Sequence, residues 1–446
     1  ELENWPLPPR RRPTPQVLAL LADVYGTNIH NLLDLDDREQ MPPADMLLIN
    51  AIRTKDMAAR DVGAAVRTEP VKLDATPRVN APNRQRFLIA ASVLGAAAVL
   101  PRHLVGPAPD PGTSPSGMAD PDDLLADLRD AVTMPAEWSS EREPTSDALT
   151  ALDARARECH SRYQRADYDG AARLLPAVVR DIEALAAAPP AGVSQHMLKR
   201  TQAVAYLAAA KLASRTSDHA LAWLAADRGQ HAALAADAPA LLATTRRQIA
   251  CVFHDTGRLA DAERVAAGAL DALDRRRGDD DSDLISARGS LLLLAAMTAV
   301  RRGERVEARR RLTAAAEHAG ALGRDGNRLW SAFGPTNVAI HTLAAALALD
   351  DPAEAVDVGA LIDTRLLPPP LVGRRARVHV DLASAHTSLG EDAVAAVHIL
   401  DVARRAPQML CFDPTARAVL ATLLGRARGS TVSVLRGVAE QVGVAS

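Results

Sequence analysis

The stretch "GRLADAERVAAGAL", residues 257–270, shares its pattern with "GERVEARRRLTAAA", residues 303–316. In each stretch a Gly is followed by an Ala five residues later and by a second Ala seven residues after the first. Gly suits a tight turn, because it lacks the side chain that restricts the backbone, and small residues let two helices cross closely. Each stretch therefore predicts a turn followed by the second helix of a helical hairpin.

The first Ala of this pattern recurs along residues 120–446. The same frame occurs in "DYDGAARLL", "SDHALAWLAADRG", "DDPAEAVDVGA" and "GEDAVAAVHIL". The alanines in register are Ala171, Ala220, Ala262, Ala308, Ala355 and Ala395, spaced by 40 to 49 residues. The repeat resembles tetratricopeptide hairpins, whose usual period is about 34 residues, so longer helices or loops are expected. We predict an all-α fold in which residues 120–446 form an α-solenoid of tetratricopeptide-like hairpins.

In a tetratricopeptide array the first helix of each hairpin lines the inner groove, so the resemblance implies which residues face it. Counting back from each crossing Ala gives ten positions. They are Asp153, His160, Tyr163, Gln202, Arg247, His254, Met297, Asn337, Arg377 and Thr387. Polar groups in a groove suit a ligand or peptide site, and the alternative is an inner face that is only solvated.

The segment "NRLWSAFGPTNVAIHTL", residues 327–343, is unusual in a chain with four Trp and four Phe residues. Trp330 and Phe333 could form an apolar wall, and Asn337 and His341 lie four residues apart on one helical face. The alternative is that the two aromatic rings fill a gap between repeats and that Asn337 caps a turn. With Arg377 as the charge partner of an anionic group, the predicted ligand or partner groove comprises Trp330, Phe333, Asn337, His341, Arg377, His254, Arg247 and Tyr163.

The string "FGPTNVAIH" is similar to a hallmark of the sensor domain in helix-turn-helix regulators of high-GC bacteria that carry tetratricopeptide-like C-terminal regions. This resemblance extends over most of residues 120–446. It implies regulation of transcription in response to a ligand or partner, which the resemblance does not name.

At the other end, "RRRPTPQVLALLADVYGT", residues 10–27, predicts a short amphipathic helix capped by Thr14 and ended by Gly26. Together with "ELEN" before it and "LLDLDD" after it, the segment resembles the end of the helix-turn-helix domain of XRE-family repressors. The two helices that enter the major groove in that family would precede Glu1, so residues 1–37 are expected to be the C-terminal remnant of a truncated domain.

Basic residues in this remnant are candidates for contact with DNA. The predicted phosphate contacts are Arg10, Arg11, Arg12 and Thr14, because a basic turn beside a recognition helix neutralises backbone charge. The alternative is a solvated basic loop, with Thr14 acting only as a helix cap.

Residues 38–119 are expected to be a linker region that contains an apolar helix at 87–100. The apolar run is 14 residues long, which is shorter than the roughly 18 to 20 residues that cross a bilayer. Arg84 and Arg86 before it are similar to a twin-arginine export signal, but the run lies inside the chain. We expect it to pack on the neighbouring domain or on a second protomer, rather than to anchor the chain to a membrane.

The composition of the chain argues against several classes of function. The chain has 446 residues, a formal net charge of −3 and three separated cysteines, Cys159, Cys251 and Cys411. It is therefore not expected to bind nucleic acids in general, and it suits the reducing cytoplasm without disulfides. No Gly-rich phosphate loop, nucleophile elbow or zinc motif occurs in the sequence, so we expect neither an enzyme nor a cofactor.

Two functions remain open. The first is a cytoplasmic transcription regulator in which the tetratricopeptide-like domain senses a ligand, peptide or protein and controls a helix-turn-helix domain that binds DNA; a homodimer is possible. The second is a tetratricopeptide scaffold that mediates protein–protein interaction without binding DNA.

Overall fold

The computed structural model describes residues 121–134, 148–275, 281–426 and 430–442, which contain 16 α-helices and no strand. The predicted all-α class is therefore confirmed for this part of the chain. The helix-turn-helix remnant at 1–37 and the apolar segment at 87–100 lie outside the described residues.

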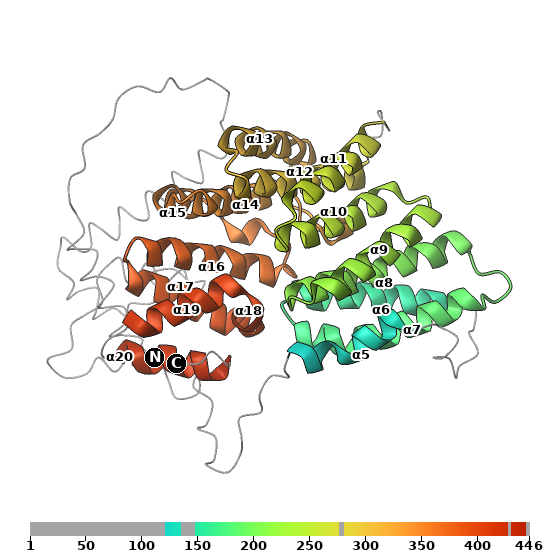
Figure 1. The fold of residues 1–446 in the computed structure, drawn as a ribbon, viewed down its shortest axis with the longest axis horizontal. Helices are drawn as coiled ribbons and strands as arrows, with labels where there is room; N and C mark the ends of the chain where they lie inside the picture. Colours follow the sequence, from blue (N-terminus) through green and yellow to red (C-terminus); the bar gives the residue numbers. More distant parts are fainter. Residues whose placement is uncertain (1–120, 135–147, 276–280, 427–429, 443–446) are drawn as a thin grey trace, which may run out of the picture. The chain divides into compact units, whose positions relative to one another are not determined.

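Twelve of these helices form six consecutive hairpins, as the repeat predicts (Figure 1). The hairpins are α6 (Ala148–Gln164) with α7 (Tyr168–Ala187), α8 (Gln195–Arg215) with α9 (His219–Ala235), α10 (Pro239–Asp255) with α11 (Leu259–Asp274), α12 (Ser282–Arg301) with α13 (Arg305–Leu322), α14 (Pro335–Ala348) with α15 (Pro352–Ala360), and α16 (Val372–Ser388) with α17 (Asp392–Arg405). The remaining elements are α5 (Pro121–Thr133), α18 (Pro407–Phe412), α19 (Pro414–Arg426), α20 (Ser430–Gln441) and the short 3₁₀ helices η3 (Arg328–Trp330) and η4 (Thr364–Leu366).

All six hairpins use the same turn of three residues between their helices. The middle residue is left-handed in each, and Gly257 and Gly303, with φ of 78° and 77°, are the glycines expected from the sequence. The amide of the next residue closes the turn: Arg258 N–H donates to the Phe253 carbonyl at 2.8 Å, and Glu304 N–H donates to the Ala299 carbonyl at 2.9 Å. This bond satisfies a helix-terminal carbonyl, which is why the helix can end so abruptly.

The crossing alanines are buried in five of the six hairpins. Those five are Ala171, Ala262, Ala308, Ala355 and Ala395. The assignment of Ala220 is wrong: this residue is exposed, and Ala222 is buried in its place. The reason is that the turn ends at Asp218, which caps α9 by accepting from the Leu221 amide at 3.0 Å, and the crossing position lies four residues after the last turn residue in every hairpin.

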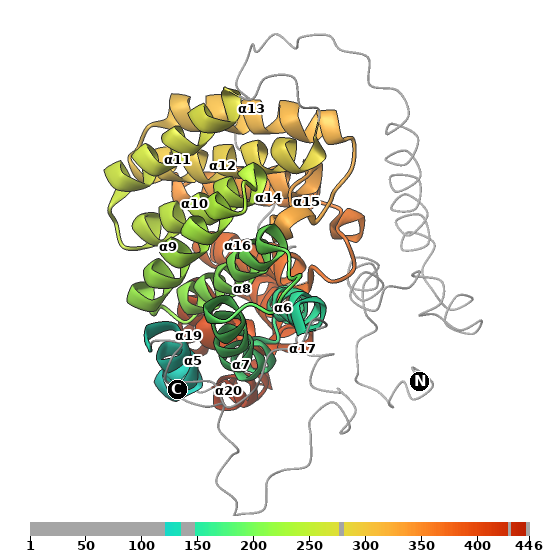
Figure 2. The ribbon, with the colours of Figure 1, turned by 90° about the vertical axis from the view of Figure 1, so that its right-hand side faces the viewer.

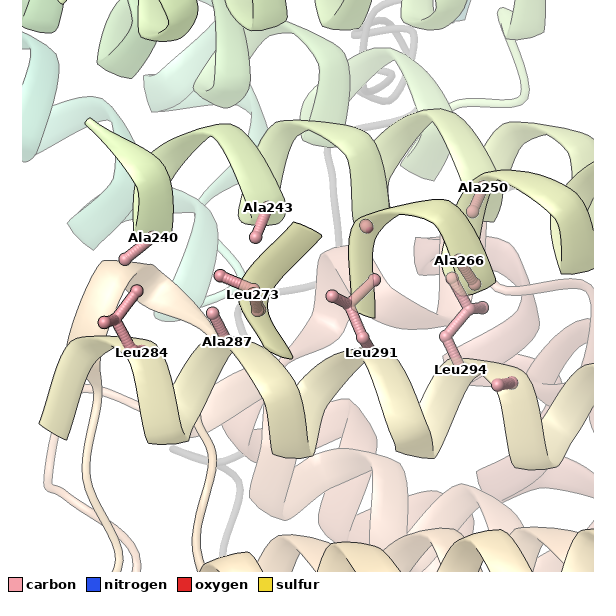
Figure 3. Packing of buried hydrophobic residues seen from close by; sticks show 11 residues of the cluster. Ala240, Ala243, Ala250, Ala266, Leu273, Leu284, Ala287, Leu291 and Leu294 are labelled. Carbon is pink, nitrogen blue, oxygen red and sulfur yellow. The ribbon is translucent and has the colours of Figure 1, made fainter. Parts of the chain in front are cut away.

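Small residues also dominate the core between hairpins. In Figure 3, Ala240 and Ala243 on α10 face Leu284 and Ala287 on α12, and Leu273 at the end of α11 closes the same cluster. Alanines on one side let the helix backbones approach until the leucines of the other side fill the remaining space.

Helix α12, at the centre of this packing, is long and apolar enough to cross a membrane by composition, with a mean hydropathy of 1.4. However, 72% of its apolar window is buried inside the protein, as expected for the core helix of a helical array.

By their contacts, the described residues fall into two units. The larger comprises residues 121–134, 148–275, 281–390, 395–425 and 437–442, and the smaller contains 391–394 with 426 and 430–436. In the smaller unit Arg426 forms an ion pair with Asp392 at 3.1 Å. All contacts described below lie within the larger unit.

Within the larger unit the last helices return to the first hairpins. The amides of Tyr168 and Asp169, at the start of α7, donate to Gln408 Oε1 on α18 at 2.6 and 3.0 Å. The Phe412 ring meets the Tyr168 ring edge-on at 5.9 Å, and α16 packs against α6 (Figure 2). The first hairpin is therefore in contact with α16 and α18, although these helices are far from it in the sequence.

Candidate functional site

An irregular loop, residues 323–334 between α13 and α14, folds against α10 and α12; we call it the inner loop. Leu329, Trp330 and Ala332 have φ of 48°, 55° and 53°, in the left-handed region that residues other than Gly rarely adopt. Such strain costs roughly 1 to 3 kcal/mol per residue, and it persists only where surrounding contacts hold it. The inner loop is therefore a strained element that other helices hold in place.

Three polar contacts hold the inner loop from distant hairpins. Asn327 and Gln164 of α6 exchange amide hydrogen bonds, both at 2.7 Å. The Lys211 ammonium of α8 donates to the Trp330 carbonyl at 2.9 Å, and the hydroxyls of Ser331 and Ser286 of α12 lie 2.9 Å apart. A change in any of these contacts would act on the same loop.

The Trp330 ring lies flat on His160 of α6, with centroids 3.9 Å apart and planes inclined by 9°. Burial lowers the pKa of His160 well below its usual value, so the ring is neutral. Its Nε2 lies 3.0 Å from the Val204 carbonyl and donates to it, while Nδ1 is buried with no hydrogen-bond partner. Trp330 is thus part of the inner lining, but its neighbour is a histidine rather than Phe333.

Phe333 and Asn337 are core residues. Phe333 is fully buried, and a Cβ placed on Gly289 of α12 would lie 1.8 Å from its Cζ, so the ring occupies the space that this glycine leaves open. Asn337 is 1% exposed and its Oδ1 has no hydrogen-bond partner. From the sequence, Phe333 is expected either to line the groove or to fill a gap between repeats. The structure agrees with the second role.

Five basic side chains from three helices gather near the inner loop, and we call them the cationic cluster. They are Lys211 and Arg215 of α8, Arg247 of α10, and Arg374 and Arg377 of α16. Lys211 and Arg377 are 166 residues apart in the chain, and the return of α16 to α6 brings their helices together.

Two carboxylates lie in this cluster. Asp413 Oδ2 lies 3.2 Å from Arg215 Nη1 and 3.1 Å from Arg377 Nη1. Asp381 Oδ1 lies 2.7 Å from Arg377 Nη2. These acids engage two of the basic side chains, so positive charge remains in excess.

Burial and mutual repulsion shift the protonation of the cluster. Burial, followed by the charge of Arg247, lowers the pKa of Lys211 to about 7 and that of Arg374 to about 10. Burial and the charge of Arg374 lower the pKa of His341 to about 3, and its Nδ1 donates to the Asn337 carbonyl at 2.8 Å. Desolvation and like charges both disfavour the protonated forms.

The structure brings together five of the eight residues predicted for the groove, and these are Tyr163, Arg247, His341, Arg377 and Trp330. Tyr163 lies close enough to Arg215 and Arg374, both part of the cluster, to act on them electrostatically. His254 lies at the far end of α10, where its Nδ1 is 3.3 Å from Thr298 Oγ1, and burial lowers its pKa to about 4.

The other inner-face positions lie elsewhere. Asp153 forms an ion pair with Arg157 at 2.6 Å, Met297 packs in an apolar cluster, and the Thr387 hydroxyl donates to the Ala383 carbonyl at 2.7 Å.

Gln202 lines a separate pocket of about 340 Å³ between α7, α8 and α9. There it donates to Glu183 at 2.8 Å, and Lys199 and Arg228 also line the pocket, which therefore holds one acidic and two basic side chains.

Sequence reasoning missed Lys211, Arg215 and Arg374. Lys211 is the only charged residue in the apolar run "AVAYLAAAKLA", and this pattern could have indicated a buried charge with a functional role. Arg374 lies three residues before Arg377 and so shares its helical face. The predicted DNA contacts Arg10, Arg11, Arg12 and Thr14 lie outside the described residues.

Burial makes the three cysteine thiols poor nucleophiles. Burial raises the pKa of Cys159 to about 12 and that of Cys411 to about 11, and it also raises the pKa of Cys251, so these thiols stay protonated. Among the described residues, no group of three or more His, Cys, Asp or Glu side chains could hold a metal ion.

No protein-family model matches the sequence, and no curated protein is significantly similar to it.

Proposed function

We propose that the chain is a cytoplasmic transcription regulator. In this proposal the helical-hairpin domain senses an effector at the cationic cluster and controls a helix-turn-helix domain to which residues 1–37 belong. The observation that carries the sensor role is the contact between the cluster and a strained loop: the Lys211 ammonium holds the Trp330 carbonyl at 2.9 Å, within a run that includes three left-handed residues.

The inner loop could adopt two states, a strained one held by Lys211 and a relaxed one released from it. A ligand shifts an equilibrium only by its difference in affinity for the two states. An effector that engages Lys211 competes with the Trp330 carbonyl, so it would bind better to a state in which the inner loop has relaxed. The energy stored in the loop, roughly 1 to 3 kcal/mol per left-handed residue, would favour that release.

The DNA-binding role is supported by the resemblance of residues 1–37 to the end of an XRE-type domain, and the cytoplasmic location by the three free cysteines. The partners in this proposal are DNA, bound through the complete helix-turn-helix, and a small-molecule, peptide or protein effector.

The test compares the chain beginning at Glu1 with a version extended through the in-frame codons that precede it in the gene. Fluorescence anisotropy measures the affinity of each for the promoter DNA of its own gene and for a scrambled duplex, at increasing salt. We expect the extended protein to prefer the promoter sequence, because in an XRE-type domain the helices that read bases precede the segment that residues 1–37 resemble. The chain from Glu1 should bind both duplexes weakly and lose this affinity with salt, since phosphate contacts alone are salt-sensitive.

A second comparison tests the sensor. The extended protein carrying Lys211→Met loses the contact that holds the Trp330 carbonyl, so its response to effector should change, whereas Lys199→Met, outside the cluster, should leave it unchanged. Equal affinity of the extended protein for both duplexes would overturn the regulator and favour the scaffold function.

A further inference from the structure

We infer that the cationic cluster is the binding site of a small, multiply charged anion that carries phosphate or carboxylate groups, held chiefly by Arg374 and Arg247. This deepens the proposed function by naming the chemical class of the effector, and it rests on the assignment of the effector site to this cluster. The cluster was absent from the residues singled out by sequence, except for Arg247 and Arg377.

Positive charge exceeds negative charge in the cluster. The two acids of the cluster are already committed: Asp413 lies between Arg215 and Arg377, and Asp381 pairs with Arg377. Neither Arg247 nor Arg374 forms an ion pair with any described residue; the Nε of Arg247 donates to the Ser290 carbonyl at 3.0 Å, and its terminal nitrogens remain available. A desolvated charge without a partner is costly, so a position that keeps one is suited to a charged ligand.

Like charges crowd around Arg374. The charges of Arg247, Arg215 and Arg377 all act on this guanidinium, and those of Arg374 and Arg247 act in turn on Lys211. Every one of these pairs repels, whereas each of these cations would attract an anion placed among them. The attraction to a bound anion would therefore offset the repulsion among the cations.

The cluster is accessible to solvent. The side chains of Arg215 and Arg377 keep 25% and 31% of their surface exposed, and Arg374 and Arg247 are also only half-buried. Desolvation is nevertheless the largest cause of the lowered pKa of Arg374. An anion that reaches these side chains therefore meets them where water screens their charge less than in bulk solvent, which strengthens the attraction.

The choice of residues points to phosphate or carboxylate. Guanidinium groups present planar pairs of N–H donors that match two oxygens of either group, and they stay charged when desolvated, unlike an ammonium. The contrast with Lys211, whose pKa burial lowers to about 7, shows the difference within one cluster. Three arginines can therefore hold two or more anionic oxygens, while Lys211 links the site to the inner loop.

The experiment uses the full chain and isothermal titration calorimetry, with inorganic pyrophosphate as the phosphate probe and citrate as the carboxylate probe, at constant ionic strength. The test variant is Arg374→Gln, which removes the charge and keeps a shorter, polar side chain. The control is Arg309→Gln, which removes an exposed arginine of α13 far from the cluster in the sequence.

We expect wild-type protein and Arg309→Gln to bind one of the probes with the same affinity, and Arg374→Gln to bind it at least about tenfold more weakly, as expected for the loss of a charge-assisted pair. The probe that binds more tightly identifies the phosphate or the carboxylate class. If Arg374→Gln loses its helical circular dichroism, Arg247→Gln provides the same comparison.

The inference is overturned if neither probe binds the wild-type protein at millimolar concentration, or if the folded Arg374→Gln and Arg247→Gln variants bind as wild type does. Because no DNA is present, this result is independent of the DNA-binding test. If the chain binds the anion but the extended protein has no selective affinity for the promoter DNA, only the regulator is refuted.

Discussion

Gly289→Ala tests the packing that holds the inner loop. A Cβ at residue 289 would lie 1.8 Å from Phe333 Cζ and 2.3 Å from its two Cε atoms, which is far closer than non-bonded carbon atoms approach. Phe333 is fully buried and belongs to a cluster with Leu293, Ala315 and Val338, so the ring has no free volume into which it can turn. The substitution must therefore displace the ring, and the inner loop with it.

The expected cost is about 1 to 3 kcal/mol, the usual range for an added methyl group in a packed core, and displacement of the strained loop would place it near the upper end. Helix propensity acts in the opposite direction, since Ala is favoured over Gly by roughly 0.5 to 1 kcal/mol within a helix. Overpacking is the larger effect here, because the overlap involves the body of a rigid aromatic ring.

Urea unfolding followed by circular dichroism at 222 nm measures the change, with Gly268→Ala as the matched control. Gly268 lies within α11, and a Cβ there would meet no atom within 4 Å, so only the propensity gain of roughly 0.5 to 1 kcal/mol should appear. Adding Phe333→Leu to Gly289→Ala should recover part of the loss, because the two residues share one space. A Gly289→Ala protein as stable as Gly268→Ala would refute this reasoning.

Two further outcomes follow from the charges and hydrogen bonds of the fold. The free energy of unfolding should fall between pH 7 and pH 5, because three partly buried histidines bind protons in the unfolded chain, where the pKa is about 6.5, and stay neutral in the folded protein. These are His254, His341 and His398, with pKa values lowered by burial to about 4, 3 and 3. Each histidine lowers the free energy of unfolding by about 1 to 2 kcal/mol over this range. Asp381 offsets part of this loss, because burial raises its pKa. Urea titrations at pH 7, 6 and 5 measure the change, and a free energy of unfolding that does not vary with pH would contradict the buried, neutral state of the histidines. Gln408→Ala leaves the Tyr168 and Asp169 amides without their acceptor, so it should cost about 1 to 3 kcal/mol in the same assay, and an unchanged midpoint would show that α18 does not hold the start of α7.

The sequence by itself determined the helical hairpins and the turns that join them. A left-handed turn residue, a closing amide and a small residue at the crossing are all local requirements, so their spacing is visible in "GRLADAERVAAGAL" without any knowledge of partners. The same logic misplaced Ala220, because the turn there uses Ser217 and ends at the Asp218 cap, and without a Gly the register is ambiguous by two residues. The true crossing residue, Ala222, is identified only once the cap is seen.

Only the tertiary structure decided which residues form the candidate site. Arg247 and Arg377 could be selected by their helical positions, and Trp330 as a rare aromatic residue. Lys211, Arg215 and Arg374 join them because the helices of the last hairpins return to α6 and α7. That return depends on side-chain contacts between residues up to 240 positions apart, such as Tyr168 with Gln408, and no local pattern encodes them. Likewise, Phe333 is core rather than groove because Gly289, 44 residues away, leaves room for its ring. Local sequence preferences determine the helices and the turn of each hairpin. The positions of the buried charges depend on how the hairpins pack against one another, and this packing involves all of them together.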